Sequence, residues 1–371
     1  MHDKPNGSNT SVTQLPAMPV GGITCVALGL FLFSCAPTRP FQPVTSLTAD
    51  AAPPPRYSIT YVIHGDGNYL YHDTGGSKHR ADEEALTRAA SVATRNPHAE
   101  VLIFHQRPKR RLLWLFSPFR DGTFYYYRHG QLLDKVSYRR NRGQTRFDPE
   151  VELYNQYHLE GQPQQVRLFL YFGHEIPELD GSGYDASYKT WSFTIDDLAG
   201  GLSSLARHST RFDLVVLSTC FNGTPHTVGA LAPYTRYIIA SPGNLHLSYY
   251  DLRPLEQLDV GLRDGDVSTF ATQLARHAFD RLTQDVQTEI TAAVYDVDRV
   301  EGYLDTVDDV YESALARLGG EARPPPERFD CAEDPAYVSN GMADGVTVFF
   351  RASRFGREKN KATHSGWECT R

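Results

Sequence analysis

Two apolar segments of the chain end next to residues that can carry out nucleophilic chemistry. Residues 166–172 (VRLFLYF) are followed by one glycine and then His174, and residues 212–217 (FDLVVL) are followed by Cys220 with two residues between. A neutral histidine can take the proton of a thiol and later return it to a leaving amine, and the thiolate is the reactive form of cysteine. The pattern predicts a His/Cys pair, and the alternative is a buried, inert Cys220.

Short apolar segments alternate with helical patterns along the chain. Helical spacing is present in residues 81–94 and 196–206, and residues 123–127 and 132–138 flank a turn typical of a hairpin. The expected buried strands are residues 58–63, 101–105, 166–172, 212–217 and 237–240. This alternation predicts an α/β fold with a mostly parallel sheet and helices on both faces. Ligands of such sheets bind beyond the carboxyl ends of the strands.

The chain divides by composition into four parts. Residues 1–34 are an expected signal peptide, residues 35–56 a Pro-rich tether, and residues 57–258 the expected α/β domain. Residues 259–371 are expected to form an α+β region that packs on this core or extends it. The expected elements of that region are helices over residues 267–283 and 300–318 and strands over residues 290–295 and 346–351.

Composition narrows the classes of function. The 371 residues carry a net charge of −7, which argues against a general nucleic-acid binder, so no nucleic acid is expected as a partner. A hydrophobic fraction of 40% and a charged fraction of 22% are typical of globular proteins. Arginines and lysines in residues 107–111 and 139–146 form either solvated loops or a surface for anionic groups. No metal ligand set is expected, because His64 and its neighbouring aspartates are more typical of turns.

An apolar run near the N-terminus indicates export. Residues 23–33 (ITCVALGLFLF) are too short to span a bilayer as a helix but fit the core of a secretory signal. The run leads into Leu-Phe-Ser-Cys35, which resembles a bacterial lipobox and implies cleavage before Cys35 and lipidation of its sulfur. We therefore expect a lipoprotein anchored to a membrane of the bacterial cell envelope. The alternative is an ordinary signal peptide with a coincidental cysteine.

The expected lipidation of Cys35 determines how the other cysteines can pair. If Cys35 carries lipid, Cys331 and Cys369 can pair as a disulfide in an oxidising compartment. Cys220 is then the odd thiol, and an unpaired cysteine in an exported protein is a candidate nucleophile.

The order of motifs resembles the clostripain family of caspase-fold cysteine peptidases. That family's core has a strand ending in His-Gly, a flexible loop, a helix, a strand ending in Asp-Ala-Cys, a helix, and a strand ending in Ala-Ser. Here the corresponding segments end in His174, Cys220 and Ser241, and residues 58–70 and 290–300 are similar to flanking parts of the family. The resemblance covers about two thirds of the chain. It implies a caspase-like fold and a peptide or protein substrate.

The resemblance also implies residue roles. His174 would be the general base and Cys220 the nucleophile, with the backbone N–H groups of Cys220 and Glu175 as the oxyanion hole. Ser218, Glu175 and Ser241 would bind substrate. No cofactor is expected, although some relatives use calcium, and an activating cleavage near Lys189 is a further possibility that the family suggests.

Two departures from the family pattern affect specificity and activity. Glu175 stands where the family has glycine, and Ser218 stands where it has the aspartate that helps bind a basic P1 side chain. We therefore expect a lipid-anchored cysteine endopeptidase whose P1 preference is not strictly Arg or Lys. The alternatives are a weak or inactive relative that binds peptides or partners in the same groove, and a structural lipoprotein scaffold.

Overall fold

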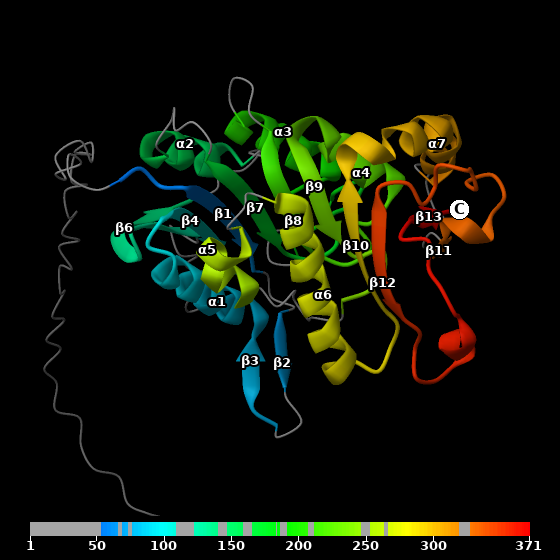
Figure 1. The fold of residues 1–371 in the computed structure, drawn as a ribbon, viewed down its shortest axis with the longest axis horizontal. Helices are drawn as coiled ribbons and strands as arrows, with labels where there is room; N and C mark the ends of the chain where they lie inside the picture. The colour runs from blue at the N-terminus through cyan, green and yellow to red at the C-terminus, as the bar shows by residue number, and fades with distance from the viewer. Residues whose placement is uncertain are drawn as a thin grey trace, which may run out of the picture. The chain divides into compact units, whose positions relative to one another are not determined.

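A nine-stranded mixed sheet forms the centre of the protein in the computed structural model (Figure 1). Cys35, Lys189 and the signal segment lie outside the residues that the structure describes. All described residues belong to one unit, Val44–Arg371. They are residues 53–65, 69–72, 76–108, 122–139, 147–158, 165–182, 184–185, 191–206, 211–245, 253–262, 266–318 and 327–371.

The strand order of the main sheet is β12-β10-β9-β8-β7-β1-β4-β5-β6. The strands from β9 to β4 in this order are parallel to their neighbours, and two antiparallel strands are added at each edge. Their bounds are β1 (Tyr57–His64), β4 (Ala99–Gln106), β5 (Gly122–Arg128), β6 (Gln131–Tyr138), β7 (Val166–Phe172), β8 (Phe212–Ser218), β9 (Thr235–Ala240), β10 (Ile290–Asp296) and β12 (Val346–Arg351). The expected mostly parallel sheet is confirmed. Because the central strands are buried on both faces, they are mostly apolar, although β1 and β4 also bury polar residues such as Thr60 and Glu100.

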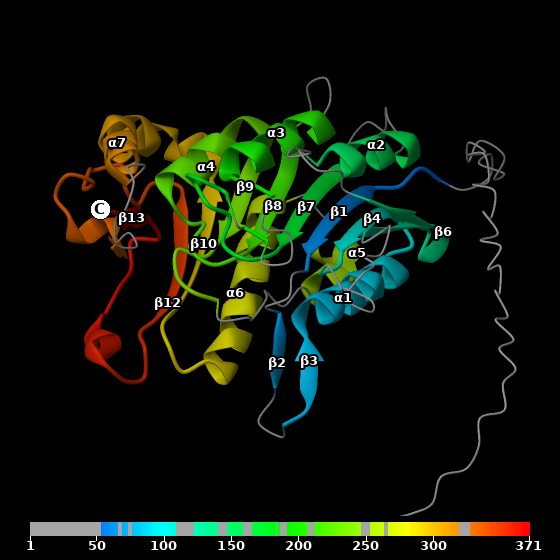
Figure 2. The same ribbon diagram turned by 180° about the vertical axis from the view of Figure 1, so that it is seen from behind.

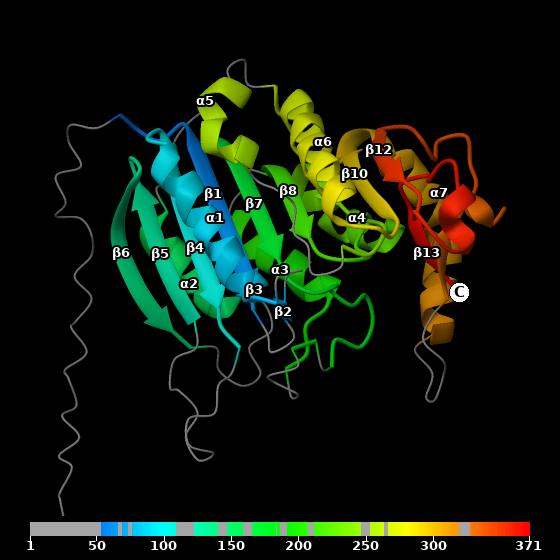
Figure 3. The ribbon, with the colours of Figure 1, turned by 90° about the horizontal axis from the view of Figure 1, so that it is seen from below.

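Helices cover both faces of the sheet, as Figures 1 and 3 show. One face packs against α2, α3, α4 and α7, and the other packs against α1, α5 and α6. The bounds are α1 (Ala81–Arg95), α2 (Asp148–Tyr157), α3 (Ile195–Ala206), α4 (Pro225–Leu231), α5 (Leu258–Gly261), α6 (Val267–Asp285) and α7 (Val297–Leu318), with 3₁₀ turns η2 (Ala232–Tyr234), η3 (Arg253–Gln257), η4 (Cys331–Glu333) and η5 (Arg357–Asn360). Within the described residues, no helix combines the length and apolar character needed to cross a membrane.

The C-terminal region belongs to the same core. Its strands β10 and β12 join the main sheet, and α6 packs on β10. The last segment forms a small second sheet, in which β11 (Arg328–Asp330) pairs with β13 (Glu368–Thr370) beside α7 (Figure 2). A hairpin of β2 (Leu70–His72) and β3 (Lys78–Arg80) follows β1.

Candidate active site

The register of β7 and β8 brings the two predicted chemical residues to one edge of the sheet. Phe172 is paired with Ser218, and these residues end their strands. His174 and Cys220 each follow this pair by two residues, on adjacent parallel strands. Carboxyl ends of parallel strands meet at the same edge, so the fold gives the His and the Cys equivalent positions there.

Gly173, directly before His174, lies where the backbone passes close to two buried tyrosines. A Cβ atom at this position would lie 2.7 Å from the ring of Tyr171 and 2.8 Å from the hydroxyl oxygen of Tyr184. The backbone therefore passes too close to two buried tyrosines for a side chain to fit. Its N–H also points to the carbonyl oxygen of Ser218 at 3.4 Å, which extends the strand pairing toward the site.

The imidazole of His174 stacks on the ring of Tyr69. Their centroids are 4.3 Å apart and the planes differ by only 12°. Tyr69 is buried, and its carbonyl oxygen accepts a hydrogen bond from the N–H of Ala81 at the start of α1. Tyr69 thus fixes the plane of the histidine ring. The sequence analysis missed it, and its place directly before β2 carried no motif that would have identified it.

The thiol of Cys220 is partly exposed and has two hydrogen-bond partners on the loop after β9. Its S–H donates to Oδ1 of Asn244 at 3.3 Å, and the N–H of Leu245 donates to Sγ at 3.3 Å. A backbone N–H that donates to sulfur favours the thiolate over the thiol. Asn244 and Leu245 are therefore further site residues, and the sequence alone gave no signal for them.

The residue after Cys220 has an uncommon backbone conformation. Phe221 has φ of 50°, in the left-handed region that non-glycine residues seldom occupy. Hydrogen bonds on both sides hold it: its own N–H donates to Gly243, and the N–H of Gly223 donates to Ser241. Such strained positions persist where the surrounding structure fixes them, and they cluster at functional sites. Here the turn holds the thiol beyond the strand end.

Side chains also join the loop after His174 to the loop after Cys220. Asn222 is fully buried, and its amide exchanges two hydrogen bonds with the backbone of Ile176. The carboxylate of Glu178 accepts hydrogen bonds from Thr224 and from Thr227 in α4. These contacts make the two loops one rigid unit.

Glu175, which stands where the clostripain family has glycine, forms an ion pair with Arg328 of β11. Burial raises the pKa of the Glu175 carboxyl above its ordinary value, and the charge of Arg328 offsets part of that effect. The family glycine has no charge to neutralise, so the ion pair is a feature of this chain's own sequence.

The two serines with expected substrate contacts occupy different positions. Ser218 is buried and is the last residue of β8, where it pairs with Phe172 two residues before Cys220. Ser241 is also fully buried, and its hydroxyl lies 2.9 Å from the carbonyl oxygen of Gly243 and 2.7 Å from that of Thr291. The Ser241 side chain therefore holds the turn after β9, and its position does not support the expected role in binding substrate.

Two further cysteines are joined. Cys331 and Cys369 form a disulfide that closes the β11–β13 sheet, and both are fully buried. The pairing that the sequence analysis considered is thus present in the structure. Cys220 is the cysteine of the described residues that lies outside this disulfide.

No set of three or more potential metal ligands gathers among the described residues. His64, which opened the candidate metal motif, instead lies 3.1 Å from a carboxylate oxygen of Asp185 and packs against Tyr184 and Trp191. The neighbouring residues 66–68 and 73–75 lie outside the described ranges.

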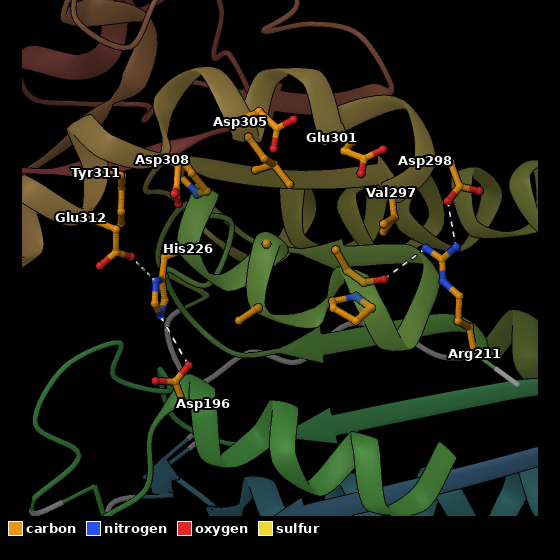
Figure 4. Close-up of a pocket in the computed structure, with 16 residues that line it drawn as sticks. Asp196, Arg211, His226, Val297, Asp298, Glu301, Asp305, Asp308, Tyr311 and Glu312 are labelled. Carbon is orange, nitrogen blue, oxygen red and sulfur yellow. Dashed lines mark hydrogen bonds and ion pairs between the residues drawn. The ribbon is translucent and has the colours of Figure 1, made fainter. Parts of the chain in front are cut away.

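A separate groove of about 700 Å³ lies between α4 and α7 (Figure 4). His226 stands in it, 3.1 Å from Glu312 and 3.9 Å from Asp196. None of the predicted site residues lines this groove. Its acidic residues are Asp196, Asp298, Glu301, Asp305, Asp308 and Glu312.

Comparison with known proteins gives a fold but no sequence match. No protein-family model and no curated protein matches the chain. An inactive zymogen C11 protease from Parabacteroides distasonis is 11% identical, with a TM-score of 0.55, over 86% of this chain and 92% of that one. A secreted C11 cysteine protease from Bacteroides thetaiotaomicron, solved with an irreversible peptide inhibitor, is 13% identical, with a TM-score of 0.48, over 69% and 70%. The chain thus has the caspase-like fold of the C11, or clostripain, cysteine proteases.

Proposed function

We propose that this protein is a cysteine endopeptidase of clostripain type with His174 as general base and Cys220 as nucleophile. The observation that carries the proposal is the register of β7 and β8, which sets both residues two positions past one strand pair. The partial exposure of the thiol and the N–H of Leu245 at its sulfur support a reactive thiolate.

The proposed reaction begins when His174 takes the thiol proton and the thiolate attacks the scissile carbonyl carbon. A carbon–sulfur bond forms, and the negative charge moves to the carbonyl oxygen, which the backbone N–H groups of Cys220 and Glu175 would stabilise. The carbon–nitrogen bond then breaks, and the amine leaves with the proton from His174. Water, with His174 again as base, hydrolyses the thioester and restores the thiol.

We propose that P1 preference is not strictly for Arg or Lys. A basic side chain in a partly buried pocket needs a carboxylate, because an unpaired buried charge is costly. Ser218 has a hydroxyl at that position, and Glu175 is already paired with Arg328. A small or polar P1 side chain fits this set of groups better.

A weak or inactive relative that binds peptides in the same groove is the second candidate. The replacements at Glu175 and Ser218 favour it, because both depart from the family pattern at residues beside the His and the Cys. Labelling by a peptidyl electrophile separates the candidates, since an inert thiol does not form the covalent adduct.

We further propose that the mature protein is anchored to the cell envelope by lipid on Cys35. The lipobox resemblance and the prolines of residues 36–56, which suit an extended spacer, support this. Replacement of Cys35 by serine should leave the protein either soluble or uncleaved. A wild-type mature N-terminus at any residue other than Cys35 would remove the anchor from the account.

The test of the proposed function is covalent labelling of the purified protein with peptidyl acyloxymethyl ketones that vary at P1. We expect a single adduct on Cys220, found by peptide mass mapping, and no adduct in the Cys220→Ala variant. Parallel reactions with calcium and with a chelator test the metal dependence that the family suggests. Labelling that is unchanged in Cys220→Ala would place the nucleophile elsewhere.

A further inference from the structure

One side chain from the C-terminal segment contacts both residues that directly follow the proposed His/Cys pair. The guanidinium of Arg328 donates a hydrogen bond to Oε1 of Glu175, and its Cζ lies 4.3 Å from the ring centroid of Phe221. These partners are more than 100 residues away in sequence. The C-terminal segment thus reaches both loops of the site through a single cation.

The segment that carries Arg328 is fixed in place next to the site. The Cys331–Cys369 disulfide joins η4, which directly follows β11, to β13, and the N–H of Cys331 donates to the carbonyl of Trp367. The N–H of Glu368 donates to the carbonyl oxygen of Gly223, which lies on the loop after Cys220. Arg328 is therefore held against the site by covalent and backbone contacts on both sides.

The charge of Glu175 makes this contact matter for acyl transfer. Negative charge develops on the carbonyl oxygen in the transition state, and donors at the oxyanion hole must stabilise it. A carboxylate on the residue that supplies one of these donors opposes that charge unless a cation neutralises it. Among the described residues, the charged or titratable groups with the largest effects on Glu175 are Arg328, Glu178 and His174. Arg328 alone both neutralises the carboxylate and contacts Phe221.

We propose, on the basis of the proposed peptidase function, that Arg328 is a positioning residue of the oxyanion hole. It neutralises Glu175 and packs over the ring of Phe221, and through these two contacts it keeps the N–H groups of Glu175 and Cys220 directed at the developing charge. The disulfide-closed β11–β13 sheet is then the part of the fold that completes the active site. Residues 327–371 thereby have a proposed role in catalysis, which their sequence alone did not indicate.

The first test compares kcat for peptide hydrolysis with the rate of alkylation of Cys220 by iodoacetamide. Alkylation needs the thiolate but no oxyanion hole, whereas hydrolysis needs both. Arg328→Met should lower kcat by roughly 10- to 100-fold, less than loss of a whole oxyanion donor, and should change the alkylation rate less than about twofold. Arg371→Met is the matched control, because Arg371 lies directly after β13 of the same small sheet but pairs with exposed Glu327. It should leave both rates unchanged.

The second test asks whether the effect acts through the charge of Glu175. The double variant Arg328→Met with Glu175→Gln should recover most of the lost kcat, because no uncompensated carboxylate remains. In Arg328→Met alone, the defect should grow as the pH rises, because loss of the cation raises the pKa of Glu175 further and the uncompensated carboxylate forms only as the carboxyl ionises. Arg328→Lys keeps the charge and should retain more activity than Arg328→Met. It also tests whether the loss in Arg328→Met comes from misfolding and not from the missing charge.

The outcomes separate this inference from the proposed function. An active wild type with an unaffected or faster Arg328→Met variant overturns the inference and leaves the peptidase in place. A defect that Glu175→Gln does not rescue would assign Arg328 a purely structural role and overturns it as well. Wild-type protein that neither hydrolyses peptides nor forms a peptidyl adduct overturns the proposed function, and this inference with it.

Discussion

The side-chain amide of Asn222 makes two hydrogen bonds to the backbone of Ile176. Oδ1 accepts from the N–H at 3.0 Å, and Nδ2 donates to the carbonyl oxygen at 2.9 Å. Asn222 lies two residues after Cys220 and Ile176 two residues after His174. One buried amide therefore fixes the distance between the two loops that carry the proposed chemistry.

Asn222→Ala should weaken both stability and activity. The change leaves the N–H and carbonyl of Ile176 buried without partners, which costs about 2–4 kcal/mol in the free energy of unfolding. Urea unfolding of wild type and variant measures this loss. Gln156→Ala is the control, because this exposed amide donates a hydrogen bond to Glu152 on the same helix, and it should stay within about 0.5 kcal/mol. Equal stabilities for Asn222→Ala and wild type would show that the hydrogen bonds between Asn222 and Ile176 do not hold the two loops together.

Tyr69 should affect catalysis through its ring and not through its hydroxyl. Tyr69→Phe keeps the stacking on His174 and should leave kcat within about twofold of wild type, while Tyr69→Leu should lower kcat by roughly tenfold because the imidazole loses its platform. Steady-state kinetics at constant pH, with thermal unfolding alongside, checks both. Equal kcat values for Leu and Phe at this position would show that the stacking does not orient the base.

Ser218→Asp should shift P1 preference toward Arg by one to two powers of ten. The new carboxylate would pair with a basic side chain, and a hydrogen bond to a charged group contributes about 1.5–3 kcal/mol. A P1-scanning peptide library on wild type, Ser218→Asp and the uncharged Ser218→Asn measures the shift. If the wild type already prefers Arg or Lys, another acidic residue lines the pocket and the argument from Ser218 fails.

The C-terminal sheet should make stability depend on pH. Burial raises the pKa of Glu368 to about 8, from 4.5 for an exposed carboxyl. The folded protein then holds a proton that the unfolded chain has lost. This contribution is full below about pH 4.5 and is lost as the pH rises through 8, on the order of 5 kcal/mol in all. Burial lowers the pKa of His364 to about 4. His364 therefore changes the pH dependence of stability only below about pH 6.5.

Above pH 6.5, Glu368 can therefore be measured without His364. Wild-type protein should lose stability in urea between pH 6.5 and 8.5, and Glu368→Gln should lose less. Glu327→Gln is the control, because the exposed pair with Arg371 lowers the pKa of Glu327, which is ionised in both states throughout this range. If the free energy of unfolding changes with pH equally in wild type and Glu368→Gln, Glu368 is not the group responsible for the loss.

Much of the fold was predictable because the central strands are mostly apolar and alternate with helical patterns. β7 (residues 166–172) has the predicted bounds, and the structure confirms the predicted helix at 81–94 with an extension of one residue. Helix α2 was missed, although Asp148 and Pro149 are a helix-start signal, because its apolar face is small. The short strands of the small sheet carry no periodicity, since a backbone pairing of three residues is decided by long-range contacts.

The site was predictable only in part, for a related reason. His174 and Cys220 follow strands whose ends meet, so their placement at one edge followed from topology. Tyr69, Asn244 and Arg328 reach the site from loops or from a distant segment, and nothing local in the sequence encodes such contacts. Ser241 has the sequence position that the family suggests, but its hydroxyl is used within the turn.

The most direct test of the central claim is kcat/KM for peptide hydrolysis by wild type, Cys220→Ala and His174→Ala, with His98→Ala as an exposed histidine control. The account predicts no detectable hydrolysis for Cys220→Ala, a loss of about 10²–10⁴ for His174→Ala, and no change for His98→Ala. A His174→Ala variant that hydrolyses peptides at the wild-type rate, or a Cys220→Ala variant that remains active, would contradict the His/Cys pair on which the account rests.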